Sequence, residues 1–339
     1  MKNKVLGCLG IVLVVVLFFS VMVNLYLLAK NAPMDLTMLG SDAIRPPQFR
    51  VMQIEPAKTA STRHRIAQID LTGIITGDAM GLDSMVTATK RALKQAVDDA
   101  RVKAIVIRID SPGGEVTASD TIYHAVKEAQ AKKPVIVFMD TVAASGGYYI
   151  ACGAGKIIAH PLSITGSIGV IMQGIGYHAL FGKVGLEMRT FKSGPMKDAG
   201  SGARPMTPEE QERFQNLVYQ NYDRFVQIVA AARSLPVDDL KKGLADGRIY
   251  LGEEAKASKL VDETGYIERA YEVARNMAGI ADAEVVRYER QPRLFDFLSL
   301  LGKAQSATAS TKIELDVSGR LLPHLKPGTC YYLMPSWVE

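Results

Sequence analysis

The sequence has few of the residues that build metal centres and disulfide frameworks. Its 339 residues include only three cysteines, none in a Cys-x-x-Cys pair, and five histidines without the spacing of metal ligands. Zinc sites need four closely placed Cys, His or acidic ligands, and disulfide-stapled folds are dense in cysteine. We therefore expect no bound metal ion, no cofactor and no disulfide framework.

Long runs of one charge are also missing. The formal net charge is only +5, and no stretch of five or six consecutive basic residues occurs. Proteins that bind nucleic acid through its phosphates usually carry clustered basic residues, so we expect no nucleic-acid partner. With 48% hydrophobic and 22% charged residues, the chain has the composition of a globular protein that can form a sizeable core.

One segment near the N-terminus lacks charge altogether, since residues 5–29 contain no charged side chain. A bilayer core about 30 Å thick needs roughly 20 helical residues, whereas the apolar part of a secretory signal has about 7 to 15. The segment therefore predicts a single membrane anchor rather than a cleaved signal. Lys2 and Lys4 precede it and Lys30 follows it, which places the N-terminus in the cytoplasm and the rest of the chain outside.

Changes in composition divide the chain into four parts. Residues 1–30 are expected to form a short cytoplasmic stub and the anchor. Residues 31–62 contain four prolines and little periodicity, which is typical of a tether. A folded domain is expected over residues 63–291. Residues 292–339 begin with a small and polar linker and end in a tail whose role the sequence does not decide.

Short apolar runs alternate with amphipathic stretches in the expected domain. The pattern predicts strands over 66–71, 104–109, 135–139, 156–159, 168–171 and 186–191. It predicts helices over 84–100, 116–131, from residue 146 onward, and over 208–232, 237–243 and 266–277. This order is typical of an α/β domain, with right-handed βαβ units around a mostly parallel sheet and a helical C-terminal part.

Two glycine-rich turns follow neighbouring predicted strands: Asp110–Gly114, with the sequence Asp-Ser-Pro-Gly-Gly, and Ala143–Tyr149, with the sequence Ala-Ala-Ser-Gly-Gly-Tyr-Tyr. Ligands of α/β sheets bind at the carboxyl ends of strands, and glycine permits close approach of the backbone. Ser145 lies between small residues, and the N–H of Gly146 at a helix start can face a developing negative charge. An ordinary strand-to-helix turn or a helix cap also accounts for each turn taken alone.

A nucleophilic serine needs a base, and familiar serine-enzyme patterns are absent. Ala143 stands where a Gly-x-Ser-x-Gly elbow has its first glycine, and the chain contains no Ser-x-x-Lys. No histidine lies in a segment with other site-like features. Lys197 follows Gly194 and Pro195 in a loop, the kind of segment that often carries catalytic groups, and Lys192 is the rival base in the same loop.

Together these segments resemble the signal peptide peptidase A family of serine peptidases, in its short form with one catalytic domain. The resemblance runs from about residue 66 to about residue 278. It rests on the order and spacing of five motifs, which are Asp110–Gly114, Ala144–Tyr149, Thr165–Val170, Lys192–Lys197 and Met206–Glu210. It implies a fold shared with ClpP and crotonase-like proteins, built from repeated ββα and βαβ units, and assembly of several subunits into a homo-oligomer.

The resemblance also implies a role for each site residue. Ser145 would be the nucleophile, Lys197 the general base, and Ser167 a hydroxyl that orients the lysine amine, while the N–H groups of Gly114 and Gly146 would form the oxyanion hole. The implied substrates are cleaved signal peptides and other hydrophobic peptides released from membranes, and the lysine can come from a neighbouring subunit. Because a general base must be uncharged, we expect Lys197 to be shielded from water in the assembled enzyme.

Two other functions fit parts of the sequence. A crotonase-like enzyme acting on a coenzyme A thioester would also use paired glycine turns, but it leaves Ser145, Lys197 and the anchor unexplained. A membrane scaffold could keep the fold without activity. The intact set of Ser145, Ser167 and Lys197 favours a membrane-anchored serine endopeptidase, with its catalytic body outside the cytoplasm on the periplasmic or outer face.

Overall fold

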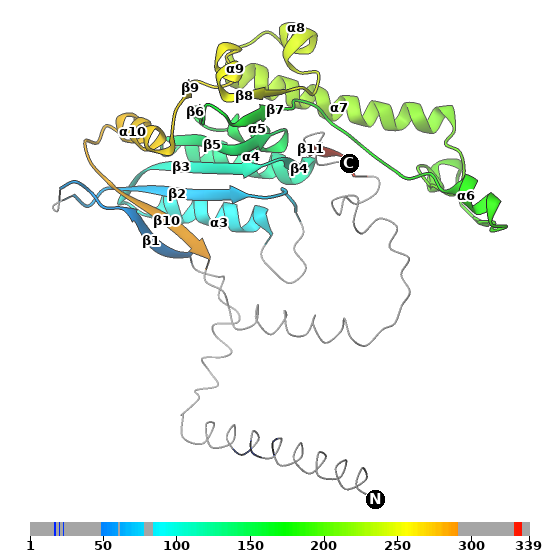
Figure 1. Cartoon of the computed structure of the whole chain (residues 1–339), viewed down its shortest axis with the longest axis horizontal. Coiled ribbons are helices and arrows are strands. Elements are labelled where there is room, and N and C mark those ends of the chain that lie inside the picture. The colour runs from blue at the N-terminus through cyan, green and yellow to red at the C-terminus, as the bar shows by residue number, and fades with distance from the viewer. Residues whose placement is uncertain are drawn as a thin grey trace, which may run out of the picture. The chain divides into compact units, whose positions relative to one another are not determined.

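A large, mostly parallel sheet forms the centre of the protein in the computed structural model (Figure 1). The structure describes residues 17, 20, 23, 49–59, 62–77, 84–290 and 329–333. The chain divides into two units, Met1–Gln48 and Phe49–Glu339, and the architecture below belongs to the second. Most of the anchor predicted over residues 5–29 lies outside the described residues. No helix in the described part is both long enough and apolar enough to cross a bilayer.

The sheet has the strand order β1-β10-β2-β3-β5-β6-β9, with β7 beside β5 and β8 beside β7. Its inner pairs are parallel, whereas β1 pairs with β10 and β8 pairs with β7 in antiparallel fashion. The bounds of its strands are β1 Phe49–Glu55, β2 Arg65–Thr72, β3 Val102–Ser111, β5 Val135–Ala144, β6 Lys156–Ala159, β7 Ile164–Gly166, β8 Ile249–Leu251, β9 Glu263–Thr264 and β10 Glu284–Arg290. A separate antiparallel pair joins β4 (Gly113–Glu115) to β11 (Tyr331–Leu333).

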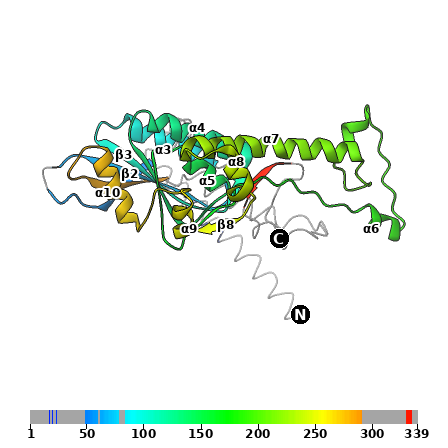
Figure 2. The ribbon, with the colours of Figure 1, turned by 90° about the horizontal axis from the view of Figure 1, so that it is seen from above.

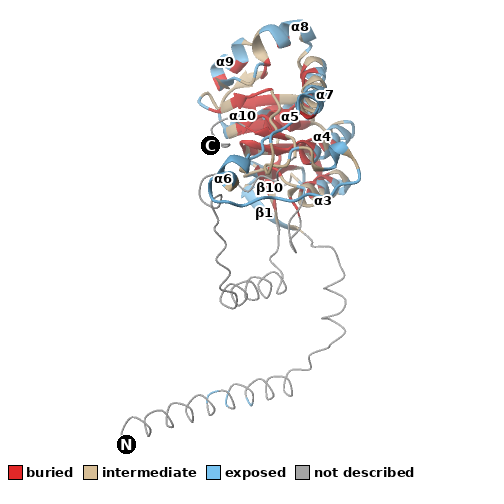
Figure 3. Ribbon diagram, turned by 90° about the vertical axis from the view of Figure 1, so that its right-hand side faces the viewer, coloured by how far each residue is buried: buried red, intermediate tan, exposed pale blue. Residues whose placement is uncertain are grey.

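Helices cover both faces of the sheet, as a parallel sheet requires. Alternate residues of β2, β3 and β5 pack against α3, α4, α5 and α7 on one face, and the others pack against α10 on the opposite face. Figure 3 shows the buried residues concentrated in the strands between these layers. The helices are α3 Met85–Asp98, α4 Val116–Gln130, α5 Gly146–Ala151, α6 His178–Lys183, α7 Pro208–Arg233, α8 Val237–Asp239, α9 Gly252–Ala257 and α10 Ile267–Met277, with a 3-10 turn η1 at Pro195–Asp198 and a π-helical turn η2 at Leu240–Leu244.

The α/β architecture expected from the sequence is confirmed in most of the body. Predicted strands over 66–71, 104–109, 135–139 and 156–159 correspond to β2, β3, β5 and β6, and the helices predicted over 84–100, 116–131, 208–232 and 266–277 correspond to α3, α4, α7 and α10. The helix expected over 237–243 is broken into α8 and η2. The C-terminal part is less helical than expected, because β8, β9 and β10 also lie there and extend the sheet.

Two predicted strands are wrong. No strand covers residues 168–171, because β7 ends at Gly166 and both Gly166 and Ser167 have positive φ values, which turn the chain. An apolar run as short as this one does not distinguish a strand from other buried structure. Residues 186–191 are irregular and exposed, and they form no strand pair with the described part of the chain.

Residues 49–55 differ from the tether expected over 31–62, because they form β1 at the edge of the sheet. Most of the side chains of β1 are exposed, so the strand lacks the alternation of buried and exposed residues that reveals a strand in a sequence. The β11 strand lies in the tail over 292–339, to which the sequence assigned no role.

An aromatic cluster connects α5, α7 and β11. The ring of Tyr149 lies 5.0 Å from that of Phe225 and stacks at 4.9 Å on that of Tyr332, and Phe225 and Tyr332 are 4.7 Å apart. All three rings are fully buried. Such aromatic contacts add to the hydrophobic stabilisation of the rings, so the cluster fixes the short helix α5 against the body.

Replacing Phe225 with alanine would leave a cavity in this cluster, and we expect it to lower the free energy of unfolding by about 3 to 5 kcal/mol. Tyr219→Ala is the matched control, because Tyr219 lies on the same helix and is 56% exposed. This control should change stability by no more than about 0.5 kcal/mol. Denaturant unfolding of both variants provides the measurement, and equal midpoints would contradict the assignment of this cluster to the core.

Candidate active site

The two glycine-rich turns lie in contact at the carboxyl ends of β3 and β5. Ser111 of β3 is paired with Ala143 of β5, so the segments that follow them emerge side by side. A Cβ atom added at Gly146 would lie 3.2 Å from the backbone nitrogen of Gly114, and one added at Gly113 would lie 2.8 Å from the nitrogen of Gly146. The fold therefore brings Gly114 and Gly146 together beside Ser145.

Ser145 has an unusual backbone conformation at the junction of β5 and α5. Its φ of 51° and ψ of −110° lie outside the regions that non-glycine residues ordinarily adopt. Its N–H donates to the carbonyl of Gly166 at 2.8 Å, which holds the turn against β7. Backbone strain of this kind costs of order 1 to 3 kcal/mol and is concentrated at functional sites.

The Ser145 hydroxyl is buried without a partner. Residue Ser145 is fully buried, and its Oγ makes no hydrogen bond with any residue that the structure describes. A buried and unpaired hydroxyl costs about 1 to 3 kcal/mol, so such groups are rare unless they have a use. Within the described chain the side chain of Ser145 is thus shielded from solvent, and its hydroxyl is available to bond another partner.

Side chains are excluded on both sides of Ser145. A Cβ atom at Gly114 would lie 2.0 Å from the carbonyl oxygen of Ile75, and one at Gly146 would lie 2.5 Å from Oγ of Ser119. Gly146 also opens α5, and its N–H has no backbone acceptor in the described part of the chain. A free N–H at this position is suited to stabilising an oxyanion.

Ser119 is a site residue that the sequence did not single out. It lies on α4, is fully buried, and its Oγ packs against Gly146 without a hydrogen-bond partner among the described residues. A single hydroxyl on an amphipathic helix resembles many others in a sequence, and only the packing of α4 against α5 places it here. The site therefore contains two unpaired hydroxyls, those of Ser119 and Ser145.

Ser167 lies close to Ser145 through the backbone of β7. It directly follows Gly166, whose carbonyl accepts the hydrogen bond from Ser145, and it is almost fully buried. Its own N–H donates to the carbonyl of Arg248 at 2.8 Å, and its φ of 49° lies in the left-handed region. Three of the predicted site elements, namely the two glycine turns and Ser167, are thus assembled within one chain.

An extended segment from the C-terminal part lies along this site. In β11, Tyr331 pairs with Glu115 and Leu333 pairs with Gly113, antiparallel to β4. Tyr331 also exchanges backbone hydrogen bonds of 3.0 and 3.1 Å with Ile171. The strand therefore lies between β4 and Ile171, beside the glycine turn.

Lys197 is not brought to Ser145 within the single chain. It lies on η1, in a segment that leaves the body after β7, passes through α6 and returns along α7 (Figures 1 and 2). We call residues 172–207 the arm. Lys197 is exposed there, so the shielding expected for it is not found within one chain and stays a prediction for the assembled protein.

The rival lysine is already engaged. The Nζ of Lys192 donates to Oδ1 of Asp198 at 2.7 Å and to the carbonyl of Pro195 at 3.1 Å. No hydrogen bond or ion pair of the Lys197 amine is found with the residues that the structure describes. Of the two lysines, Lys197 thus has the amine that is available for another partner.

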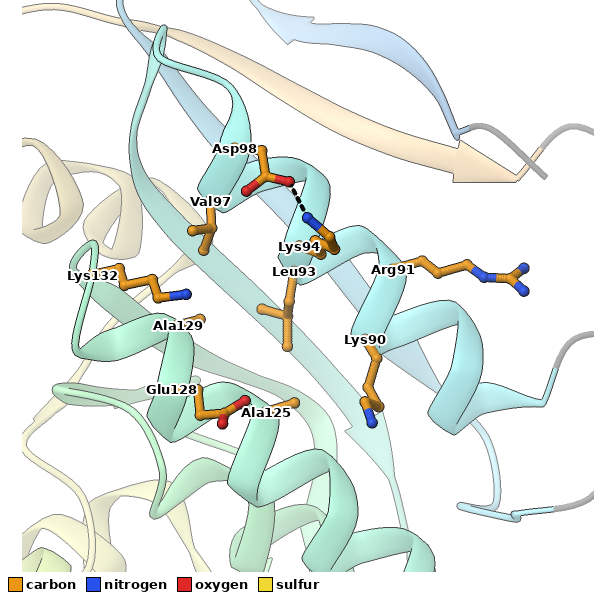
Figure 4. A pocket seen from close by; sticks show the side chains of 10 residues that line it. All are labelled: Lys90, Arg91, Leu93, Lys94, Val97, Asp98, Ala125, Glu128, Ala129 and Lys132. Atoms are coloured by element: carbon orange, nitrogen blue, oxygen red, sulfur yellow. Dashed lines mark hydrogen bonds and ion pairs between the residues drawn. The ribbon is translucent and has the colours of Figure 1, made fainter. Parts of the chain in front are cut away.

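A pocket lies on another part of the surface, between α3 and α4 (Figure 4). Its apolar lining includes Leu93 and Val97, and Lys94 at its edge pairs with Asp98 at 2.5 Å. None of the predicted site residues lines it. Among the described residues, no three His, Cys, Asp or Glu side chains are grouped as metal ligands would be, and the expected absence of a metal and a cofactor stays a prediction.

Comparison with known proteins gives matches to two families of peptidases. The family model described as peptidase family S49 matches residues 127–281, and the model for Clp protease matches residues 80–168. A protein of Synechocystis sp. that is named a protease is 42% identical over 227 residues, which are 67% of this chain and 79% of that protein.

Two further relatives are longer than the matched region. A protein of Enterococcus faecium named for signal peptide peptidase SppA is 40% identical over 58% of this chain and 57% of its own length. Protease 4 of Salmonella typhi is 35% identical over 62% of this chain and 34% of its own length. The chain has a mixed α/β, ClpP-like fold. Together with these matches, this shows that the chain belongs to peptidase family S49 and is a serine protease.

Proposed function

We propose that this serine protease is an endopeptidase in which Ser145 is the nucleophile and Lys197 the general base. The observation that carries the proposal is the strained turn at Ser145, which holds a buried and unpaired hydroxyl beside Gly114 and Gly146. Membership of a protease family favours this function over a crotonase-like thioester enzyme or a non-catalytic scaffold.

Each residue has a defined part in the reaction. The neutral amine of Lys197 removes the proton of the Ser145 hydroxyl, whose oxygen attacks the peptide carbonyl. The N–H groups of Gly114 and Gly146 stabilise the oxyanion, and Lys197 then protonates the leaving amine. Water then attacks the acyl-enzyme: Lys197 removes a proton from the water and returns it to the oxygen of Ser145 as the acyl group leaves. Ser167 orients the lysine amine through its hydroxyl.

The base comes from a second copy of the chain. Lys197 is exposed on the arm, whereas Ser145 is enclosed in the body, and among the described residues of one subunit no base is bonded to the Ser145 hydroxyl. The arm carries exposed apolar side chains, which is unusual unless they meet a partner. These side chains include Leu180, Val184, Leu186, Met188 and Phe191, the last 97% exposed. Burial between subunits favours the uncharged form of a lysine amine.

The substrate is a hydrophobic peptide bound as an extended strand. The position of β11 supports this, since an extended segment already fits between β4 and Ile171 beside Ser145. A peptide that displaces β11 would add to the edge of β4 as a strand, which is a common mode of recognition. The ring of Tyr332 packs on Tyr149 and Phe225, so a peptide in the place of β11 would find a contact surface for large apolar side chains. Cleaved signal peptides have this chemistry.

Membrane anchoring is a further part of the proposal. The charge-free segment over residues 5–29 supports a single-pass anchor with a cytoplasmic N-terminus and a catalytic body on the periplasmic or outer side of the cell membrane. An enzyme in this position meets apolar peptides as they leave the bilayer.

Substitution of either member of the pair should stop peptide hydrolysis. We expect Ser145→Ala and Lys197→Ala to lower kcat about 1000-fold or more, because removing a nucleophile or its base disables the whole unit. Lys90→Ala, at an exposed lysine on α3 of the body, is the control and should leave activity unchanged. Hydrolysis of a fluorogenic hydrophobic peptide is measured. If Lys192→Ala abolished activity and Lys197→Ala did not, the base would be Lys192.

Mixed assemblies test whether the base crosses between subunits. Chains carrying Ser145→Ala supply intact lysines, and chains carrying Lys197→Ala supply intact serines. When the two are expressed together, some sites combine both intact residues, so activity should appear that neither variant has alone. Differently tagged chains that co-purify without any activity would show that the pair forms within one subunit.

Alanine at the glycine turns should impair the oxyanion hole. Because the new methyl group of Gly146→Ala would meet Ser119 and the backbone of the facing turn, we expect kcat to fall about 100- to 1000-fold. Gly243→Ala is the control, since no atom lies within 4 Å of its added Cβ. Thermal unfolding of both variants separates a loss of catalysis from a loss of fold, and full activity in Gly146→Ala would exclude this turn from the oxyanion hole.

A further inference from the structure

The turn that carries Lys197 is joined to a cluster of ion pairs. Asp198 follows Lys197 directly, and its side chain is only 13% exposed. Its Oδ1 accepts from Lys192 at 2.7 Å and from Nη2 of Arg204 at 2.6 Å, while its Oδ2 accepts from Nε of Arg204 at 3.0 Å. Both carboxylate oxygens are therefore bound by the planar guanidinium, a geometry that fixes direction as well as distance.

Arg204 continues from this turn to the start of α7. Its Nη1 donates to Oε2 of Glu210 at 2.9 Å, and its Nη2 also bonds Oε1 of the same carboxylate. Glu210 is the buried end of the cluster, with its side chain 2% exposed. It closes the capping box of α7 by accepting from the N–H of Thr207 at 2.9 Å. Arg204 thus connects the lysine turn to a helix whose other end packs in the core.

Packing alone does not hold this turn. None of the residues of η1 is buried, and Lys197 and Met196 are exposed. The backbone of the turn contributes short-range bonds, such as the one from the N–H of Lys197 to the carbonyl of Gly194 at 3.1 Å. The orientation of η1 relative to α7 therefore depends on the two carboxylates that Arg204 bridges.

The cluster also neutralises the negative charge of Asp198, which is next to Lys197 in the sequence. Hydrogen bonds from Arg204 and Lys192 hold the pKa of Asp198 well below its usual range, and those from Arg204 lower the pKa of Glu210 to about 2. Asp198 is therefore negative at any working pH. An uncompensated carboxylate beside a lysine favours the ammonium form, which cannot act as a base. A pocket lies beside this turn, and the charged residues that line it are Lys192, Arg204, Glu209 and Glu210.

We propose that Arg204 is a positioning residue for the Lys197 amine, acting through Asp198 and Glu210. It orients the turn that carries the lysine, and it binds the Asp198 carboxylate so that this carboxylate does not pair with the Lys197 ammonium. The inference rests on the proposed function, in which Lys197 is the general base.

The test compares kcat and KM over a range of pH for peptide hydrolysis by the full chain. Arg204→Ala should lower kcat about 10- to 100-fold with little change in KM, because a misplaced catalytic group slows the chemical step. The acid limb of the kcat profile should move to higher pH by roughly one unit or more, since Lys192 then remains as the one side-chain partner found for Asp198 among the described residues, and the carboxylate can also pair with Lys197. Arg204→Lys should recover part of kcat, because it restores the charge without the forked geometry.

Arg269→Ala is the matched control. Arg269 also bridges two carboxylates, those of Glu263 and Glu272, but it lies on α10 of the body. This variant should keep the wild-type kcat and pH profile. If Arg269→Ala and Arg204→Ala lose activity alike, with the same pH profile, the role of Arg204 is general stabilisation and the inference is wrong.

A double variant separates the two parts of the inference. Adding Asp198→Asn to Arg204→Ala removes the carboxylate, so the acid limb should return toward its wild-type position while kcat stays low. An acid limb that does not move in Arg204→Ala, or does not return in the double variant, overturns the charge argument. Should Arg204→Ala fail to fold, as judged by its melting curve and oligomeric state, Glu210→Gln tests the same bridge with an isosteric side chain and should also lower kcat.

The proposed function fails in a different way. Full activity of Lys197→Ala would remove the base from the mechanism whatever Arg204 does. Loss of activity in Lys197→Ala, together with wild-type kcat and pH profile in Arg204→Ala, would leave the dyad intact and reject only the positioning role.

Discussion

The site depends on the contact between two glycine turns that leave no space for a side chain. Ser145 can keep its strained conformation only because the turn is held from both sides, by the Gly166 carbonyl and by the backbone of Gly113 and Gly114. That contact depends in turn on the parallel register of β3 and β5, which brings both turns to one edge of the sheet. The aromatic cluster of Tyr149, Phe225 and Tyr332 then fixes α5, which starts at the serine.

Sequence reasoning succeeded where local chemistry decides the structure. The parallel core strands are short runs of Val and Ile, and the turns after them contain glycine pairs, so β3, β5 and their loops could be predicted together. Sequence reasoning failed where the structure of a segment depends on residues that are distant in the sequence. The edge strand β1 has no buried face, and β11 depends on pairing with β4 across more than two hundred residues of chain. The strand expected at 168–171 was lost because Ser167 adopts a positive φ that its sequence does not reveal.

The lysine illustrates a different limit. A sequence can place Lys197 in a loop with glycine and proline, but the loop belongs to an arm whose apolar side chains find no partner within the described part of the chain. A conformation stabilised by another subunit leaves no periodic pattern in its own sequence. Ion pairs such as that of Asp198 with Arg204 cannot be predicted from the sequence either. The two residues are six positions apart in an irregular segment, where sequence spacing does not determine which side chains face each other, as it does in a helix.

A division of labour follows for the proposed mechanism. The body supplies the nucleophile and the oxyanion donors, whose positions are fixed by sheet register and glycine contacts. The arm supplies the base, whose position is fixed by charge pairs and, in the assembly, by the neighbouring subunit. Only an uncharged amine can accept the serine proton, and burial between subunits favours that form. In the proposed mechanism peptide cleavage is coupled to assembly, because the interface that desolvates Lys197 would complete the catalyst.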